Sequence, residues 1–148
     1  MAVKKRKKVV NSTKKTYDGI NFASLLEVHM YKLLKKAGIK FKYEGKSYIT
    51  FEPFELNTEC YERATKRSKE TINRPRVTKV SYTPDFIGDK EKWFIEVKGR
   101  ANESFSIRWK LFKKKIAKDN PKALIFKPMN NKDCEQVIEI LKQQGYGR

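Results

Sequence analysis

The most constraining feature of the sequence is a pair of apolar, strand-like runs joined by a short turn, VSYTPDFIG and KWFIEVKG. Gly88, Asp89 and Lys90 supply the turn residues between the two runs, so we expect an antiparallel hairpin. Each run carries an acid that is unexpected among its apolar neighbours, Asp85 in the first and Glu96 in the second. Pairing of these strands would bring the two carboxylates near each other.

Two neighbouring carboxylates repel one another unless a cation lies between them. Mg²⁺ suits such a position, because it takes oxygen ligands, keeps several waters and commonly uses one or two carboxylates plus a substrate phosphate. Residues two apart on a strand share a face, so we expect Lys98 to point with Glu96, where it can contact the same phosphate. Taken alone, the motif favours a simpler interpretation, an exposed turn acid and a cross-pleat ion pair, because charged runs are usually solvated faces.

The charge of the chain indicates a polyanionic partner. Its 148 residues include 35 Lys and Arg against 17 Asp and Glu, a formal net charge of +18. This favours nucleic acid first and an anionic membrane second. The sequence has no run of 18 apolar residues and no signal-peptide core, so we expect a cytoplasmic protein without membrane attachment. One histidine and two separated cysteines argue against zinc sites and histidine-dependent hydrolases.

The remaining pattern predicts one α/β domain that follows a basic arm. Residues 1–16 carry seven Lys or Arg and no acid, and we expect a flexible arm there. Residues 54–79 lack periodicity, which predicts a long loop or a basic insertion with a short helix. Helices are predicted over residues 21–38, 103–121 and 131–145, and further strands over 39–44, 46–53 and 123–128, the first two as a hairpin or one long bent strand. This order favours an α/β sandwich around a short mixed sheet.

Basic side chains gather in two places that we predict to bind nucleic acid. The helix predicted over residues 103–121 has an apolar stripe that includes Trp109, and no acid lies between Glu103 and Asp119 on its remaining surface. Lys and Arg contacts with phosphate give affinity without sequence readout, although lysine-rich helix faces are often only solvated. The predicted binding residues are Arg63, Lys66 and Arg67 in the insertion and Arg108, Lys110, Lys113, Lys114 and Lys118 on the helix.

Taken as a set, several motifs resemble the PD-(D/E)XK nuclease superfamily. They are TPDF, the apolar strand with IEVKG, the upstream helix in LLEVHMYKLLKKAGIKFKYE and the downstream helix. The match is closest to small phage Holliday-junction resolvases of the endonuclease I type. It covers Phe22 to Pro121, with residues 54–79 as the main departure. The resemblance implies a restriction-endonuclease-like core, a short mixed sheet flanked by helices, within one domain at residues 17–148.

The resemblance also implies a role for each matching residue. Asp85 and Glu96 take the places of the two metal-binding acids, the Val97 carbonyl that of a third ligand, and Lys98 that of the catalytic lysine. Glu27 matches a helix glutamate that supports a metal or its water, but it can instead close a capping box with the serine three residues earlier. The implied cofactor is Mg²⁺, with Mn²⁺ as a substitute, and the implied assembly is a homodimer with exchanged elements.

The function implied by this resemblance is a Mg²⁺-dependent endodeoxyribonuclease of phage DNA metabolism, acting in the bacterial host cytoplasm. We expect it to be structure-selective, cutting branched DNA such as Holliday junctions. One alternative is a restriction- or transposase-like nuclease of the same superfamily that cuts ordinary duplex. Another is a non-catalytic DNA-binding, packaging or virion-associated protein, against which the intact acid, acid and lysine set argues.

Overall fold

The computed structural model describes residues 15–148, so most of the predicted basic arm, residues 1–14, lies outside the described residues. The chain divides into two compact units. The terminal unit contains the described residues up to Phe41, with Glu96–Arg100 and Lys127–Arg148. The sheet unit contains Lys42–Ile95 and Ala101–Phe126. Each unit therefore joins segments that are distant in the sequence.

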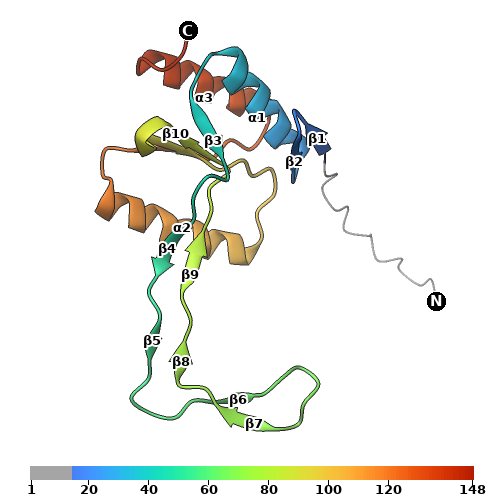
Figure 1. Cartoon of the computed structure of the whole chain (residues 1–148), viewed down its shortest axis with the longest axis vertical. Helices are drawn as coiled ribbons and strands as arrows, with labels where there is room; N and C mark the ends of the chain where they lie inside the picture. Colours follow the sequence, from blue (N-terminus) through green and yellow to red (C-terminus); the bar gives the residue numbers. More distant parts are fainter. Residues whose placement is uncertain (1–14) are drawn as a thin grey trace, which may run out of the picture. The chain divides into compact units, whose positions relative to one another are not determined.

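The terminal unit pairs two helices with a small hairpin. Strands β1 (Lys15–Tyr17) and β2 (Ile20–Phe22) are antiparallel, and helices α1 (Leu25–Lys36) and α3 (Asn131–Gln143) pack together (Figure 1). The Tyr31 hydroxyl on α1 donates a 2.6 Å hydrogen bond to Asp18 in the β1–β2 turn, and the nearby carboxylate raises the pKa of Tyr31 to about 12. Residues 15 and 16 of the predicted arm thus belong to a strand.

Both helices of this unit begin at a side-chain cap. The Ser24 hydroxyl accepts a hydrogen bond from the N–H of Glu27, and the Asn130 side chain accepts one from Asp133. These bonds satisfy N–H groups that have no partner within the helix. The predicted helices are confirmed, although the first begins at Leu25, after the β2 strand, instead of at residue 21.

The sheet unit contains a four-stranded mixed sheet in the order β12-β11-β10-β3, except for Phe41, the first residue of β3, which is counted with the terminal unit. Its strands are β3 (Phe41–Tyr43), β10 (Phe86–Gly88), β11 (Trp93–Ile95) and β12 (Leu124–Phe126). The β10–β11 pair is antiparallel, whereas β11 and β12 are parallel. A short mixed sheet was predicted, and the mixed α/β class is confirmed.

Helix α2 (Glu103–Asp119) supplies most of the apolar cover for this unit. Asn102 caps the helix by accepting a 2.7 Å hydrogen bond from the N–H of Phe105. The predicted apolar stripe is confirmed as core, including Trp109. The cluster consists of Phe105, Trp109, Phe112 and Ile116 from α2 with Tyr48, Tyr82, Ile87 and Phe94 from the strands.

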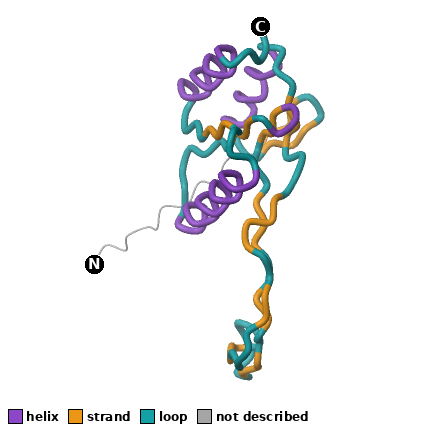
Figure 2. Tube along the Cα trace, turned by 90° about the vertical axis from the view of Figure 1, so that its left-hand side faces the viewer, coloured by secondary structure: helices purple, strands orange, loops and turns teal. Residues whose placement is uncertain are grey.

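The other strands of the sheet unit form one long two-stranded ribbon, which we call the ribbon, over residues 48–82. Figures 1 and 2 show its three antiparallel pairs following one another. They are β4 (Tyr48–Phe51) with β9 (Val80–Tyr82), β5 (Phe54–Glu55) with β8 (Arg76–Val77), and β6 (Tyr61–Arg63) with β7 (Thr71–Asn73).

The ribbon corrects two predictions. Residues 54–79 are neither a long loop nor an insertion with a helix, because their short strands pair with one another across the ribbon. Residues 39–44 and 46–53 do not form a hairpin or one bent strand, since β3 joins the four-stranded sheet and β4 pairs with β9. Glu44, which has a φ of 46°, lies at the break between β3 and β4. No helix among residues 15–148 is long and apolar enough to cross a membrane.

Candidate functional site

The hairpin that carries the two predicted acids forms as expected. Phe86 of β10 pairs with Ile95 of β11 in an antiparallel register. Asp85 directly precedes Phe86, and Glu96 directly follows Ile95. One peptide bond therefore separates each acid from the same rung of the ladder. In the division of the chain, Asp85 belongs to the sheet unit, whereas Glu96 begins a segment of the terminal unit.

The strand ends earlier than predicted. β11 stops at Ile95, so Glu96, Val97 and Lys98 lie in the segment without regular secondary structure that follows it. Glu96 and Val97 are both buried and Lys98 is half-buried, so burial does not alternate here as it would on a regular strand. The N–H of Lys98 donates a 3.0 Å hydrogen bond to the Pro128 carbonyl, which anchors this segment within the terminal unit.

Three charged side chains are buried in the part of the chain that the structure describes. They are Glu27, Asp85 and Glu96, with exposed fractions of 5%, 9% and 8%. Ionisable carboxylates are seldom buried to this extent, because water stabilises their charge better than a protein interior does. These are the same three acids that the sequence motifs indicated, chosen from 17 in the chain. Their burial concentrates charge where electrostatic interactions are strongest.

Glu27 makes the capping box that the sequence offered as its alternative role. Its carboxylate accepts hydrogen bonds from the Ser24 hydroxyl at 3.1 Å and from the N–H of Ala23 at 3.4 Å. Its own N–H donates to the Ser24 hydroxyl at 3.2 Å. The capping box is therefore confirmed, and the metal-supporting role of Glu27 stays a prediction.

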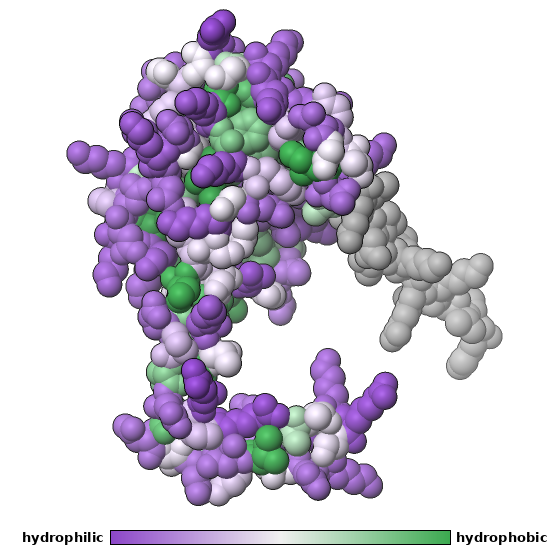
Figure 3. Space-filling view, in the orientation of Figure 1, coloured by the Kyte–Doolittle hydropathy of each residue, from purple (hydrophilic) through white to green (hydrophobic). Residues whose placement is uncertain are grey.

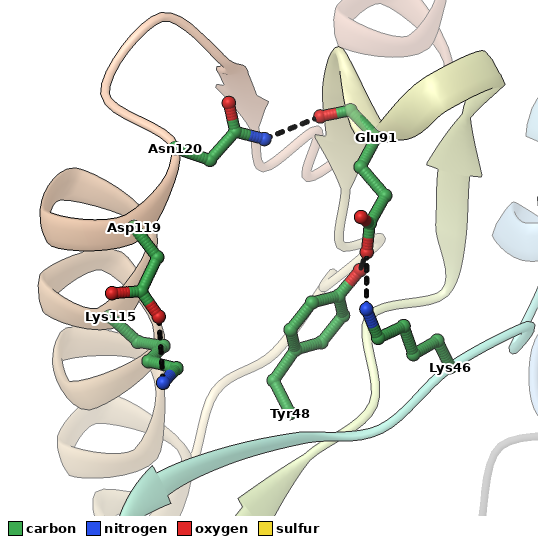
Figure 4. Close-up of polar contacts among 6 residues, drawn as sticks. All are labelled: Lys46, Tyr48, Glu91, Lys115, Asp119 and Asn120. Carbon is green, nitrogen blue, oxygen red and sulfur yellow. Dashed lines mark hydrogen bonds and ion pairs between the residues drawn. The ribbon is translucent and has the colours of Figure 1, made fainter.

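A polar network supports the turn of the hairpin (Figure 4). The Glu91 carboxylate accepts a hydrogen bond from the Tyr48 hydroxyl and forms a 2.9 Å ion pair with Lys46. The side-chain amide of Asn120, after α2, donates to the Glu91 carbonyl at 2.7 Å. These bonds to Tyr48 and Lys46 lower the pKa of Glu91, while burial and the adjacent carboxylate raise that of Tyr48. Because Tyr48 and Glu91 are far apart in the sequence, no local motif predicts this network.

Two further details explain the geometry of the turn. Lys90 and Glu91 both have a φ of 55°, in the left-handed region that non-glycine residues seldom adopt. The bonds to the Glu91 side chain and carbonyl help to hold this conformation. Gly88 has a separate requirement, since a Cβ atom there would overlap the buried ring of Trp93.

A hollow of about 620 Å³ opens beside this network, within the sheet unit. Tyr48, Phe94 and Ile116 contribute apolar lining, and the charged lining includes Lys115 and Asp119. The last two form an ion pair at 2.7 Å along α2, apart from the pair that Glu91 forms with Lys46 (Figure 4). The positive and negative side chains of the hollow thus pair with one another, and the hollow carries no excess of either charge. Sequence patterns did not indicate it.

The predicted nucleic-acid-binding residues of α2 are all exposed, but they differ in their contacts. Arg108 donates to the Ser81 carbonyl at 3.1 Å and lies over the Tyr82 ring, with 5.7 Å from its Cζ to the ring centroid. Lys113 lies 5.9 Å from the centroid of the Trp109 ring. The other three are spaced four residues apart and so form one row along the helix, namely Lys110, Lys114 and Lys118.

The three predicted binding residues of the insertion lie on the outer part of the ribbon. Arg63 ends strand β6, and Lys66 and Arg67 lie in the loop that joins β6 to β7. All three are exposed. The pairing of β6 with β7 brings these residues to the end of the ribbon, and no local sequence pattern predicted that pairing.

The donor set of the hairpin segment fits a hard cation. Two carboxylates, Asp85 and Glu96, and the Val97 carbonyl offer oxygen alone, which Mg²⁺ and Mn²⁺ accept. Among residues 15–148, no three His, Cys, Asp or Glu side chains form a metal-binding group by themselves. A Mg²⁺ site of this kind needs only one or two protein carboxylates, because water and substrate phosphate complete its octahedral shell.

Comparison with known proteins gives a family without an assigned activity. No curated protein and no solved structure matches the chain. Residues 6–133 match the family described as a protein of unknown function, DUF1064. Since this match spans well over half of the chain, the protein belongs to the DUF1064 family.

Proposed function

We propose that this protein is a Mg²⁺-dependent endonuclease that hydrolyses DNA phosphodiester bonds. The observation that carries the proposal is the burial of Glu27, Asp85 and Glu96, the three acids of the nuclease-like motifs. Perturbed or buried ionisable groups concentrate at functional sites. The β10–β11 register adds support, because Asp85 and Glu96 adjoin the same rung.

The chain's own residues would divide the chemistry between them. Asp85, Glu96 and the Val97 carbonyl would hold Mg²⁺. When bound, this ion supplies charge neutralisation at the phosphate and a water of lowered pKa. Lys98 would contact the scissile phosphate or orient the attacking water through its ammonium group. The bond from its N–H to Pro128 fixes the backbone of this segment, and so limits the positions of the Val97 carbonyl and of Lys98.

DNA is the proposed substrate because the net charge of +18 suits a polyanion. The row of Lys110, Lys114 and Lys118 would bind backbone phosphates, which gives affinity for any sequence. We further propose selectivity for branched DNA such as Holliday junctions, and a homodimer, since these accompany the motifs in resolvases of the endonuclease I type. Cutting of ordinary duplex is the alternative within the same chemistry.

The decisive experiment compares a supercoiled plasmid, a four-way junction and a linear duplex, each with Mg²⁺ or with EDTA. We expect the wild type to cut the junction in Mg²⁺ only. Asp85→Asn and Glu96→Gln should each abolish cutting. Asp89→Asn, in the exposed turn of the same hairpin, is the matched control and should cut normally.

Each other result has a definite meaning. Binding without cutting in any divalent metal would leave a non-catalytic DNA-binding protein. Cutting of the linear duplex as fast as of the junction would remove the branched-DNA selectivity and favour a restriction- or transposase-like enzyme. A monomeric mass in solution and on DNA would remove the dimer.

A further inference from the structure

The outer part of the ribbon, residues 60–74, is exposed on both faces. Every residue of β6 and β7 is exposed, with Tyr61 at 63%. A two-stranded ribbon without a core is only marginally stable in water. Because these residues bury little surface, their folding contributes little to the stability of the chain. Exposed extensions of this kind often carry the residues that contact a partner.

The loop at the end of this ribbon is nevertheless held by specific bonds. Its strands close with a 2.9 Å hydrogen bond from the Ala64 N–H to the Glu70 carbonyl. Inside the loop, the Ser68 N–H donates to the Thr65 hydroxyl at 2.9 Å. The Arg74 guanidinium reaches along the ribbon to the Ala64 carbonyl at 2.6 Å. These bonds define the conformation in which the loop presents its basic residues.

An irregularity in strand pairing redirects this outer part. The Leu56 N–H donates to the Pro75 carbonyl, and the next bond joins the Arg74 N–H to the Cys60 carbonyl. Residues 57–59 are therefore extra on one strand, with no counterpart on the other. An insertion of this kind bends a ribbon and changes its direction, and Figure 1 shows β6 and β7 turned away from the line of β5 and β8.

The two faces of β6–β7 differ in chemistry. Directly paired residues share a face, so the pairs Tyr61 with Asn73 and Arg63 with Thr71 lie together. This face carries hydrogen-bonding groups and the Arg63 guanidinium, and at its inner end the Tyr61 hydroxyl donates to the Glu59 carboxylate. The opposite face of the same strands carries the remaining pair, Glu62 with Ile72. Among these paired residues the base lies on the first face and the acid on the second, so the first face suits a negatively charged surface better.

The charge of the segment is strongly positive. Residues 61–76 contain six Lys or Arg and two Glu. Three of these bases belong to the end loop, Lys66, Arg67 and Lys69, and all three are exposed. Figure 3 shows the outer ribbon covered mainly by hydrophilic side chains, with isolated hydrophobic ones between them. Exposed bases next to hydrogen-bonding side chains suit nucleic acid better than they suit an apolar partner.

We propose that β6 and β7 lie in the major groove of duplex DNA, with the face of Tyr61, Arg63, Thr71 and Asn73 towards the base edges. A major groove of about 12 Å admits a two-stranded ribbon, whereas a minor groove of about 6 Å is hardly wider than the roughly 4.8 Å between the two backbones alone. The basic end loop contacts phosphates beside the groove. The inference rests on the proposed function only in taking DNA as the partner.

The test uses a duplex whose major groove is filled. Two duplexes of one sequence are compared in EDTA, one with ordinary cytosine and one with glucosylated 5-hydroxymethylcytosine, whose sugars occupy the major groove and leave the minor groove open. We expect the full-length chain to bind the glucosylated duplex roughly tenfold more weakly or worse, because its base edges are blocked. Distamycin, which occupies the minor groove, should not compete.

Variants assign the effect to the ribbon. Arg63→Ala combined with Thr71→Ala should weaken binding to the ordinary duplex and remove the difference between the two duplexes, while the Asn73 side chain, which accepts a 3.0 Å hydrogen bond from the Cys60 N–H, stays in place. Glu62→Ala combined with Ile72→Ala, on the opposite face, is the matched control and should keep the difference.

The possible failures separate this inference from the proposed function. Equal binding of both duplexes by the wild type, or a difference that survives in Arg63→Ala with Thr71→Ala, overturns the groove assignment and leaves the nuclease proposal standing. Cutting lost in Asp85→Asn with the groove effect intact is expected, because the two sites are separate. Absence of any DNA binding overturns both.

Discussion

Two antiparallel hairpins of the sheet unit have opposite surroundings. Every residue of β10 and β11 is buried, because the pair lies between β3 and β12 and contributes to the core beneath α2. Every residue of β6 and β7 is exposed, because that pair has no further strand beside it among the described residues. The two hairpins share antiparallel backbone pairing, but one is packed on both sides by neighbouring strands and the other, in the described part of the chain, is not.

The difference separates two kinds of charged residue. Next to the buried hairpin a carboxylate is costly to desolvate, and the burial of Asp85 and Glu96 therefore suits the proposed chemistry in a site of low dielectric constant. On the exposed hairpin, bases such as Arg63 cost little, and they suit contacts that form only when a partner arrives. The buried hairpin thus offers a rigid setting for the proposed catalysis, and the exposed hairpin an accessible surface for the proposed contact with DNA.

The largest expected effect tests the packing side of this contrast. Phe94→Ala removes a buried ring that contacts Tyr48 and Phe112, and should lower the free energy of unfolding by about 3–5 kcal/mol. Ile72→Ala, on the exposed hairpin, should change it by about 0.5 kcal/mol or less. Urea denaturation followed by circular dichroism measures both. Similar losses in the two variants would mean that the outer ribbon is packed in solution.

The second effect tests the chemistry assigned beside the buried hairpin. Lys98→Met should slow single-turnover cutting of a four-way junction by about a hundredfold or more, the usual result of removing one group that stabilises transition-state charge. Binding of the junction in EDTA should change little. Lys92→Met, an exposed lysine at the other end of the hairpin, is the matched control. Normal cutting by Lys98→Met would remove the catalytic role of Lys98.

The buried hairpin could be predicted from the sequence because its signals are local. Two apolar runs flank a turn at Gly88, and the paired rung lies only a few residues from that turn. The stripe of α2 was predictable for the same reason, since helical spacing repeats within each turn. The motifs also indicated Asp85 and Glu96, but their depth of burial depends on packing that no local pattern specifies.

The ribbon and the Glu91 network could not be predicted in this way. The strands of the outer ribbon have only two or three residues each, too few to show an alternating pattern, and Pro53 and Pro75 interrupt them. The pairing of Phe51 with Val80 and the bond from Tyr48 to Glu91 join distant residues. Such contacts arise from the tertiary fold, which overrides weak local preferences.

A smaller effect decides between the two roles of Glu27. Gln can replace Glu in a capping box, so Glu27→Gln should keep the cap and the stability while removing the charge. Ser24→Ala removes the cap and should cost about 1 kcal/mol. If Glu27 supports the metal or its water, only Glu27→Gln slows cutting, whereas normal cutting by this variant would leave Glu27 as a cap. Thermal melting and junction cleavage, measured on both variants, separate the outcomes.

The smallest expected effect is the loss, at low pH, of the stability that Glu91 contributes at the turn of the buried hairpin. The Tyr48 hydroxyl and Lys46 hold the pKa of folded Glu91 below its ordinary value of 4.5. Ionised Glu91 therefore stabilises the folded state above pH 4.5, and this contribution is lost as the pH falls through the lowered pKa. Because the Glu91 side chain is 41% exposed, Glu91→Gln should cost only about 1 kcal/mol or less near neutral pH.

The pH dependence of that loss identifies its origin. The difference between Glu91→Gln and the wild type should shrink once the wild-type carboxylate is protonated, and Tyr48→Phe should show a change of the same sign. The double variant should lose less than the sum of the single variants, since the two side chains share one hydrogen bond. Urea denaturation at neutral pH and below pH 4 provides the comparison. A loss that is equal at both pH values would show that Glu91 acts through the shape of the turn and not through its charge.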